Sequence, residues 1–216
     1  MDSLVSIIIP HWNGIDVLSE CLDSLKKTVY PNFEIIVVDN ASTDGSEDWI
    51  KDNHPQIKLI KNDQNYGYAG GCNRGVPQAD GDLVVFLNND TVQDKDWLQN
   101  LVSFINSQPD CAAVQPKILN YYERNRFDYA GGSGGHMDVL CYPFARGRIF
   151  LEQEIDSGQY DDDHRCFWAS GTAIMVRKDC FMEAGQFDEN FFAHMEEIDL
   201  CWKLQLMGYK VFVHPE

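Results

Sequence analysis

Short runs of β-branched residues alternate with helix-like segments through the first half of the chain. Four apolar runs predict strands, at residues 5–9, 34–38, 57–60 and 83–87. The segments between and after them predict four helices. The first spans residues 15–29, the second begins at about residue 44, the third ends at about residue 79, and the fourth spans about 95–106. This alternation of strand and helix predicts a parallel, right-handed, doubly wound α/β sheet.

The second half of the chain has a different pattern. Residues 117–164 are rich in Gly, Tyr, Arg and Asp without clear periodicity, and we expect mobile loops at 131–135 and 156–164. The remaining elements are strands at 111–115, 166–176 and 209–213 and a helix at 196–207. We expect one domain over residues 1–216, cut from a longer protein because the chain stops on a strand-like pattern.

Polar clusters follow three of the predicted strands at their carboxyl ends. The clusters are Pro10–Asn13, Asp39–Asp44 and Asn88–Asp90. In open α/β sheets, ligands bind in the crevice at the carboxyl ends of the strands. The three clusters therefore predict one shared site.

Each polar segment has a binding interpretation and a structural alternative. Asp39 could accept the N3–H of a uracil or thymine ring, or it could cap the next helix, a role that we assign mainly to Asp44. Asp90 with Asn88 offers oxygen ligands that suit Mg²⁺ or Mn²⁺, although a plain turn has the same composition. The glycine-rich segment 65–73 could bring backbone N–H groups to a pyrophosphate, or allow a helix to pack closely on the sheet.

A further acidic group stands at the start of the helix predicted at 196–207. Glu196, Glu197 and Asp199 lie within one turn. Crowded carboxylates can supply a general base, whereas acids at a helix N-terminus commonly just complement the helix dipole. Asp199 and Lys203 are four residues apart, which favours a structural ion pair.

Composition limits the function classes further. A net charge of −17 argues against nucleic acid as a partner and against a polybasic contact with a membrane. An acidic protein that handles phosphates needs added positive charge, most simply a divalent metal. The seven cysteines are scattered without a CxxC pair, and neither a secretory signal nor a 20-residue apolar stretch is present. We therefore expect reduced, mostly buried thiols and a cytoplasmic location.

Seven segments together resemble the family 2 inverting glycosyltransferases, and most of all their rhamnosyltransferase-like subgroup. The resemblance covers nearly the whole chain. The matching segments are Ser6–Pro10 with Asn13, Val37–Ser46, Asn65–Gly75, Phe86–Thr91, Ala169–Ala173, Gly185–Phe192 and Glu196–Trp202.

This resemblance implies a GT-A fold with a mostly parallel sheet and a mixed C-terminal part. It implies a nucleotide-binding half at 1–110 and an acceptor-binding half at 111–216. The implied reaction is metal-assisted transfer with inversion, from a UDP- or dTDP-sugar to a glycan or lipid-linked acceptor in surface polysaccharide synthesis. Membrane contact at the inner face would come only through a missing C-terminal part.

The resemblance also assigns roles to residues. Mg²⁺ or Mn²⁺ would bind Asp90 and Asn88, where Asn88 replaces the first acid of the family's D-x-D motif. Glu197 would be the base, with Glu196 as the other candidate. The implied donor-binding residues are Pro10, Trp12, Asn13, Asp39, Asn65, Gly70, Gly71, Asn73, Asn88 and Asn89. As acceptor-binding residues we expect Trp168, Gly171, His194 and Asp199, with the 131–135 loop.

Two alternatives stay open beside the enzyme. A non-catalytic nucleotide-sugar binding module would agree with the departures at Asn88 and Glu197 and with the cut C-terminus. A sugar nucleotidyltransferase would normally carry a basic, glycine-rich triphosphate loop, and Pro10–Asn13 is not one. The segment 213–216 resembles the part of related enzymes that precedes a metal-binding histidine, so we interpret His214 itself as strand-end structure.

Overall fold

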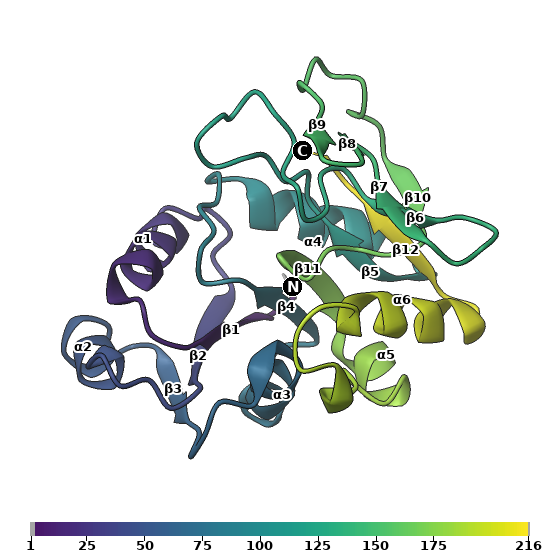
Figure 1. The fold of residues 1–216 in the computed structure, drawn as a ribbon. Coiled ribbons are helices and arrows are strands. Elements are labelled where there is room, and N and C mark those ends of the chain that lie inside the picture. The colour runs from purple at the N-terminus through teal and green to yellow at the C-terminus, as the bar shows by residue number, and fades with distance from the viewer. Residues whose placement is uncertain (1–2, 216) are drawn as a thin grey trace.

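A mixed eight-stranded sheet forms the centre of the molecule in the computed structural model, which describes residues 3–215 (Figure 1). Glu216, the end of the segment 213–216, lies outside these residues. The strand order within the described part is β10-β12-β5-β11-β4-β1-β2-β3. Its strands are β1 (Val5–His11), β2 (Phe33–Asp39), β3 (Lys58–Lys61), β4 (Leu83–Leu87), β5 (Cys111–Gln115), β10 (His164–Cys166), β11 (Ala173–Arg177) and β12 (Lys210–Val213).

The sheet is parallel where the first half of the chain builds it. Strands β4, β1, β2 and β3 are neighbours in parallel register, and β5 pairs with β12 in the same way. Strand β11 lies antiparallel between β4 and β5, and β10 is antiparallel to β12. The predicted α/β class with a mostly parallel sheet and a mixed C-terminal part is confirmed.

Helices cover both faces of the sheet. They are α1 (Ile15–Leu25), α2 (Ser46–Asn53), α3 (Gly67–Gly75), α4 (Trp97–Ser107), α5 (Lys178–Glu183) and α6 (Glu196–Leu206), with 3-10 turns η1 (Val76–Gln78) and η2 (Glu189–Phe191). Ile7 and Ile9 of β1 pack with residues of α1, α2 and α4, whereas Ile8 packs with residues of α3, α5 and α6. Burial on both faces explains the continuous apolar run of β1, and each buried isoleucine contributes about 1.5–3 kcal/mol.

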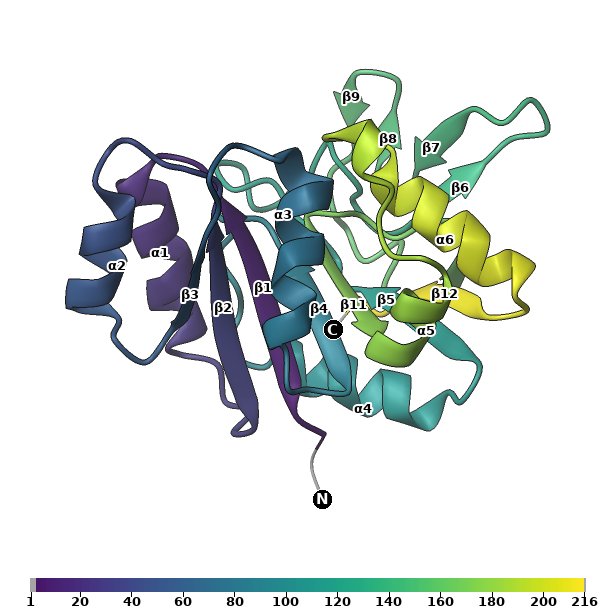
Figure 2. The ribbon, with the colours of Figure 1, turned by 90° about the horizontal axis from the view of Figure 1, so that it is seen from below.

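Two small hairpins occupy the region without periodicity. One consists of β6 (Gly135–Met137) and β7 (Pro143–Ala145), and the other of β8 (Arg148–Ile149) and β9 (Glu152–Gln153). Both project on the side of the molecule where β1 and β2 end, and β8 and β9 lie near the start of α6 (Figure 2).

The prediction of a mobile loop at 131–135 is wrong. All five residues are buried, and the backbone N–H of Ser133 donates to the carbonyl oxygen of Arg146. A Cβ at Gly135 would lie 1.9 Å from Cε2 of Trp168. The glycines therefore permit close packing rather than motion.

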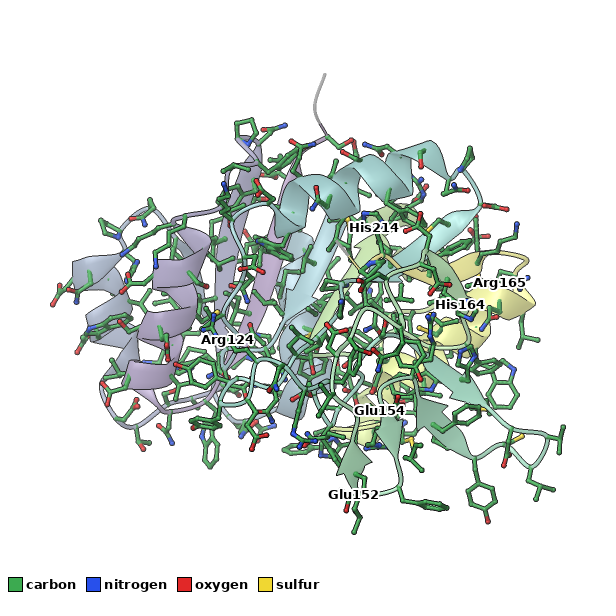
Figure 3. The ribbon with its side chains drawn as sticks, turned by 90° about the horizontal axis from the view of Figure 1, so that it is seen from above. Arg124, Glu152, Glu154, His164, Arg165 and His214 are labelled. Carbon is green, nitrogen blue, oxygen red and sulfur yellow. The ribbon has the colours of Figure 1, made fainter. Side chains whose placement is uncertain are left out.

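The segment 156–164 is also held in place. Lys117 makes ion pairs with Asp156 and Asp161, and Arg146 makes one with Asp162. His214 lies beside this segment at the end of β12, near His164 on the neighbouring strand (Figure 3). The ring of His214 pairs with Asp163 and stacks on Phe104, so its interpretation as strand-end structure is confirmed.

The strand predicted at 166–176 is instead two strands, β10 and β11, separated by a turn. Ser170 holds this turn, because its backbone N–H donates to Gln115 and its hydroxyl donates to the carbonyl oxygen of Ala130. The helix predicted at 15–29 ends at Leu25, and α5 was not predicted. All seven cysteines are free, and all but Cys141 are buried. Within residues 3–215, no helix has both the length and the apolar character to cross a membrane.

Candidate active site at the carboxyl edge of the sheet

A cleft of about 290 Å³ lies where β1, β2 and β4 end. It is lined by Pro10, His11, Trp12, Asn40, Asn65, Gly67, Tyr68, Asn88, Asn89, Asp90, Phe192 and Ala193. Strand β1 lies between β4 and β2, so the loops after these three strands meet at one edge. The predicted meeting of polar clusters at this edge is present in the structure.

Half of the ten predicted donor-binding residues line this cleft, together with the predicted metal ligand Asp90. The residues that line it are Pro10, Trp12, Asn65, Asn88 and Asn89. The residues that lie outside its lining are Asn13, Asp39, Gly70, Gly71 and Asn73.

Trp12 stands at the cleft on a loop that is fixed by hydrogen bonds. The backbone N–H of Asn13 donates to Ser42 Oγ over 2.8 Å, and Asn13 Oδ1 accepts from the backbone N–H of Thr43 over 2.8 Å. Asp44 accepts from the backbone N–H groups of Gly14 and Ser46, at 2.7 Å and 3.1 Å. Asn13 therefore positions the 56% exposed indole of Trp12 rather than contacting the cleft itself.

Asp39 is fully buried. Its two carboxylate oxygens lie 3.3 Å and 3.2 Å from the backbone N of Ser42, which donates to them. This contact is the turn-capping alternative. Asp39 also lies opposite His11 in the parallel register of β1 and β2, at the same sheet edge as Asp90. Its contact with a heterocycle stays a prediction.

The loop after β4 fits a hard divalent cation. Asp90 is exposed at the cleft, and no described residue makes a hydrogen bond or ion pair with its carboxylate. Asn88 is held through its backbone, whose N–H donates to the carbonyl oxygen of Thr172 over 3.0 Å. One carboxylate and one amide suit Mg²⁺ or Mn²⁺ when phosphate oxygens complete the shell. Residues 3–215 contain no group of three His, Cys, Asp or Glu residues that could hold a metal without such help.

The glycines of α3 serve close packing in two cases. A Cβ at Gly71 would lie 2.9 Å from Nδ2 of Asn40, and one at Gly70 would lie 2.7 Å from Cβ of Tyr66. The packing alternative therefore accounts for Gly70 and Gly71. Asn73 Nδ2 donates to the carbonyl oxygen of Phe187 over 2.9 Å, and Asn73 Oδ1 accepts from the backbone N–H of Phe187 over 3.2 Å. These two hydrogen bonds join α3 to the turn before η2.

The N-terminus of α3 reaches the cleft, but part of it is already occupied. The backbone N–H of Gly67 donates to Asn65 Oδ1 over 2.8 Å, and that of Ala69 donates to the carbonyl oxygen of Phe192. These two N–H groups are not available to an anion. The predicted pyrophosphate contact through this helix is correspondingly limited.

Two desolvated carboxyl groups open helix α6. Burial raises the pKa of Glu196 to about 7, and the charge of Glu197 acts in the same direction. Burial also raises the pKa of Glu197. Oε2 of each residue is buried without a hydrogen-bond partner among the described residues. Neither residue belongs to the lining of the cleft, which ends at Ala193. Carboxyl groups with raised pKa values are suited to proton transfer near neutral pH.

Tyr68 lies in the cleft lining and within range of the charges of the acidic pair, and the sequence interpretation did not single it out. Its side chain lines the cleft, and its hydroxyl donates to the carbonyl oxygen of Gly171 over 2.5 Å. Burial raises the pKa of Tyr68, and the charges of Glu196 and Glu197 contribute to that rise. The only sequence signal was its place in the glycine-rich segment. His11 and Asn40 lie in two of the polar clusters that were predicted to form the site, although neither was assigned a role of its own. The lining residues Phe192 and Ala193 were not predicted to lie at the cleft.

The predicted acceptor residues are not gathered in one pocket. Trp168 is 6% exposed and its indole N–H donates to the carbonyl oxygen of His136, so the structure gives it a packing role. Asp199 pairs with Lys203 over 2.5 Å, as the structural alternative predicted. His194 is exposed, in a left-handed backbone conformation with φ 71°, just before α6. Gly171 contributes its carbonyl oxygen to Tyr68.

Comparison with known proteins identifies the class. The model of the family described as "Glycosyl transferase family 2" matches residues 6–176, and the chain belongs to this family. The O-antigen biosynthesis protein RfbC of Myxococcus xanthus is 32% identical over 96% of this chain and 16% of its own length. The poly-beta-1,6-N-acetyl-D-glucosamine synthase of Staphylococcus epidermidis is 26% identical over 98% of this chain and 48% of its own length. The chain thus spans less than half the length of these relatives.

Solved structures show the fold independently. The mannosyltransferase PcManGT from Pyrobaculum calidifontis, in complex with GDP-Man and Mn²⁺, superposes with a TM-score of 0.72 at 20% identity, over the whole of this chain and 56% of that one. GalNAc-T7 with UDP, GalNAc and Mn²⁺ superposes with a TM-score of 0.76 at 16% identity, over 98% of this chain and 42% of that one. The fold is GT-A.

Proposed function

We propose that this chain is the catalytic domain of an inverting glycosyltransferase. It would move a sugar from a UDP- or dTDP-sugar to a glycan or lipid-linked acceptor in surface polysaccharide synthesis. The observation that carries the proposal is the arrangement of the cleft, with the free carboxylate of Asp90 and the ring of Tyr68 in its lining and the desolvated pair Glu196 and Glu197 near enough for its charge to act on Tyr68.

The acidic pair supplies the base. Glu197 would accept the proton of the acceptor hydroxyl as that oxygen attacks the anomeric carbon. With a pKa of about 7, Glu196 is partly protonated at neutral pH, so the pair need not carry two full charges. We choose Glu197 because it is less buried than Glu196, which is 4% exposed.

The donor would lie along the other side of the cleft. Asp90 and Asn88 would hold Mg²⁺ or Mn²⁺, which when bound supplies positive charge for the leaving diphosphate. Two structural relatives are complexes with Mn²⁺ and a nucleotide or nucleotide sugar, which supports this choice of cofactor. Trp12, exposed on a fixed loop, offers an aromatic surface to the donor.

Several finer assignments stay predictions. They are the rhamnosyltransferase-like subgroup, the choice between hexosyl and rhamnosyl transfer, the cytoplasmic location, membrane contact through further segments, and the division into two halves at residue 110. The O-antigen and poly-N-acetylglucosamine relatives support polysaccharide synthesis as the setting.

The test is a panel of UDP-, dTDP- and GDP-sugars with and without Mn²⁺, read by thermal shift and by release of nucleoside diphosphate. We expect one sugar nucleotide to stabilise the protein only with the metal and to be turned over. Glu197→Gln should lower turnover about 100-fold or more while donor binding persists. Near-normal turnover by this variant would reject Glu197 as the base. Metal-dependent binding without turnover in the intact protein would instead favour the non-catalytic module, which the amide at Asn88 supports.

A further inference from the structure

His11 is buried in the floor of the cleft with both ring nitrogens engaged. It is the last residue of β1 and is 1% exposed. Its Nδ1 lies 2.9 Å from Nδ2 of Asn89, and its Nε2 lies 2.9 Å from Oγ of Ser46. The ring therefore bridges the loop after β4 and the first residue of helix α2.

The directions of these hydrogen bonds follow from Asp44, which accepts a hydrogen bond from Ser46. Asp44 is an ionised carboxylate, because hydrogen bonds from Ser46 and Gly14 overcome the effect of burial and lower its pKa to about 2. A carboxylate only accepts, so the single hydroxyl proton of Ser46 goes to Asp44 Oδ1. Ser46 Oγ can then only accept from His11, which places the ring proton on Nε2.

The second ring nitrogen of His11 determines the orientation of the Asn89 amide. The ring is 1% exposed, and its two hydrogen-bond partners are a hydroxyl and an amide, so no carboxylate in contact balances a positive charge. Burial also lowers the pKa of His11, against the charges of Asp39 and Asp44. The ring is therefore neutral, and Nδ1 carries no proton. Nδ1 must accept, and only Nδ2 of Asn89 can donate to it. Oδ1 of Asn89 is thereby left without a partner among the described residues, on a side chain that lines the cleft.

We propose that His11 is a positioning residue that holds the Asn89 amide with its oxygen free for the ligand. The loop Asn88–Asp90 then offers acceptor oxygens at the cleft. A hydrogen-bond acceptor at Asn89 suits either the hydroxyl groups of a donor sugar or the cation with its bound water. The identity of the ligand in this inference rests on the proposed function. The hydrogen bonds that join Asn89, His11 and Ser46 do not depend on it.

The first test needs no ligand. Long-range ¹H–¹⁵N correlation on the uniformly labelled protein at pH 7 reports the tautomer of each of the six histidines. We expect the signals that vanish in His11→Asn to show a protonated Nε2 and an unprotonated Nδ1. In Ser46→Ala, which removes the acceptor of Nε2–H, this preference should weaken. A proton on Nδ1 in the wild-type protein would overturn the inference.

Two matched variants test the effect on binding. Asn at position 11 places an amide atom one bond from Cγ, where Nδ1 lies, and can present its oxygen to Asn89. Gln at this position reaches toward Ser46 but leaves the amide of Asn89 without an acceptor. We expect His11→Asn to keep the affinity within about threefold and His11→Gln to lose at least about tenfold, which corresponds to about 1.4 kcal/mol.

The probes identify the ligand and separate the two hypotheses. Affinities would be measured by calorimetry for Mn²⁺ alone, for UDP with Mn²⁺, and for the sugar nucleotide that binds the wild-type protein best. A loss that already occurs with Mn²⁺ alone assigns the Asn89 oxygen to the cation, and a loss only with the sugar nucleotide assigns it to the sugar. Equal affinities, or equal losses, in both variants would overturn the positioning role. If the wild-type protein binds none of the probes, the proposed function fails while the tautomer measurement still stands.

Discussion

Replacing Glu196 with Gln should stabilise the protein at alkaline pH. The folded state binds the carboxyl proton more tightly than the unfolded chain, since the pKa of Glu196 rises from 4.5 to about 7. Between these pH values the folded protein holds more protons than the unfolded one, so its stability falls as the pH rises. At about 1.4 kcal/mol per pKa unit, the full loss above pH 7 is roughly 3 kcal/mol. Glutamine cannot ionise and avoids this loss.

The assay is urea unfolding of the two proteins at pH 5, 6, 7 and 8 with reductant present, followed by tryptophan fluorescence. The variant should gain little at pH 5 and up to about 3 kcal/mol at pH 8. Glu47→Gln is a control of opposite sign, because ion-paired hydrogen bonds from Lys51 and Lys61 lower the pKa of Glu47 to about 2. Glu47→Gln should be less stable than the wild-type protein above pH 5, because it loses the stabilisation that the ionised Glu47 gives the folded state. An unchanged or lower stability of Glu196→Gln at pH 8 would refute the desolvation of Glu196.

Three further changes test other parts of the molecule. Asp90→Ala should abolish the stabilisation by Mn²⁺ with UDP in a thermal-shift assay, and an undiminished shift would place the cation elsewhere. Gly135→Ala should lose about 1–3 kcal/mol or more in urea unfolding, because its Cβ meets the ring of Trp168. Lys117→Met removes the cation that pairs with two aspartates of the 156–164 segment, and limited proteolysis should then cut that segment faster, whereas unchanged cleavage would show that the ion pairs do not hold it.

The sequence was informative where one residue pattern has one physical outcome. The apolar run at 5–9, within β1, is buried on both faces of a parallel sheet, and such a strand needs this composition. The polar residues Asn88–Asp90 directly follow the buried strand β4, so their place at the edge of the sheet was predictable. The glycines at 131–135 were misinterpreted, because glycine serves equally for mobility and for close approach. Only the neighbouring indole of Trp168, far along the chain, decides between the two.

The hydrogen-bond bridge through His11 was beyond prediction for a different reason. Periodicity identifies strands but does not give their order, and the order β4-β1-β2 is what places His11 between Asn89 and Ser46. With β1 at an edge, the same histidine would face solvent and its protonation would place no restriction on the amide. The middle position buries the ring, and burial makes the proton on each polar atom decisive, because an unmatched donor there costs about 1–3 kcal/mol. The ionised state of Asp44, on one loop, thereby determines which atom Asn89 presents to the ligand on another.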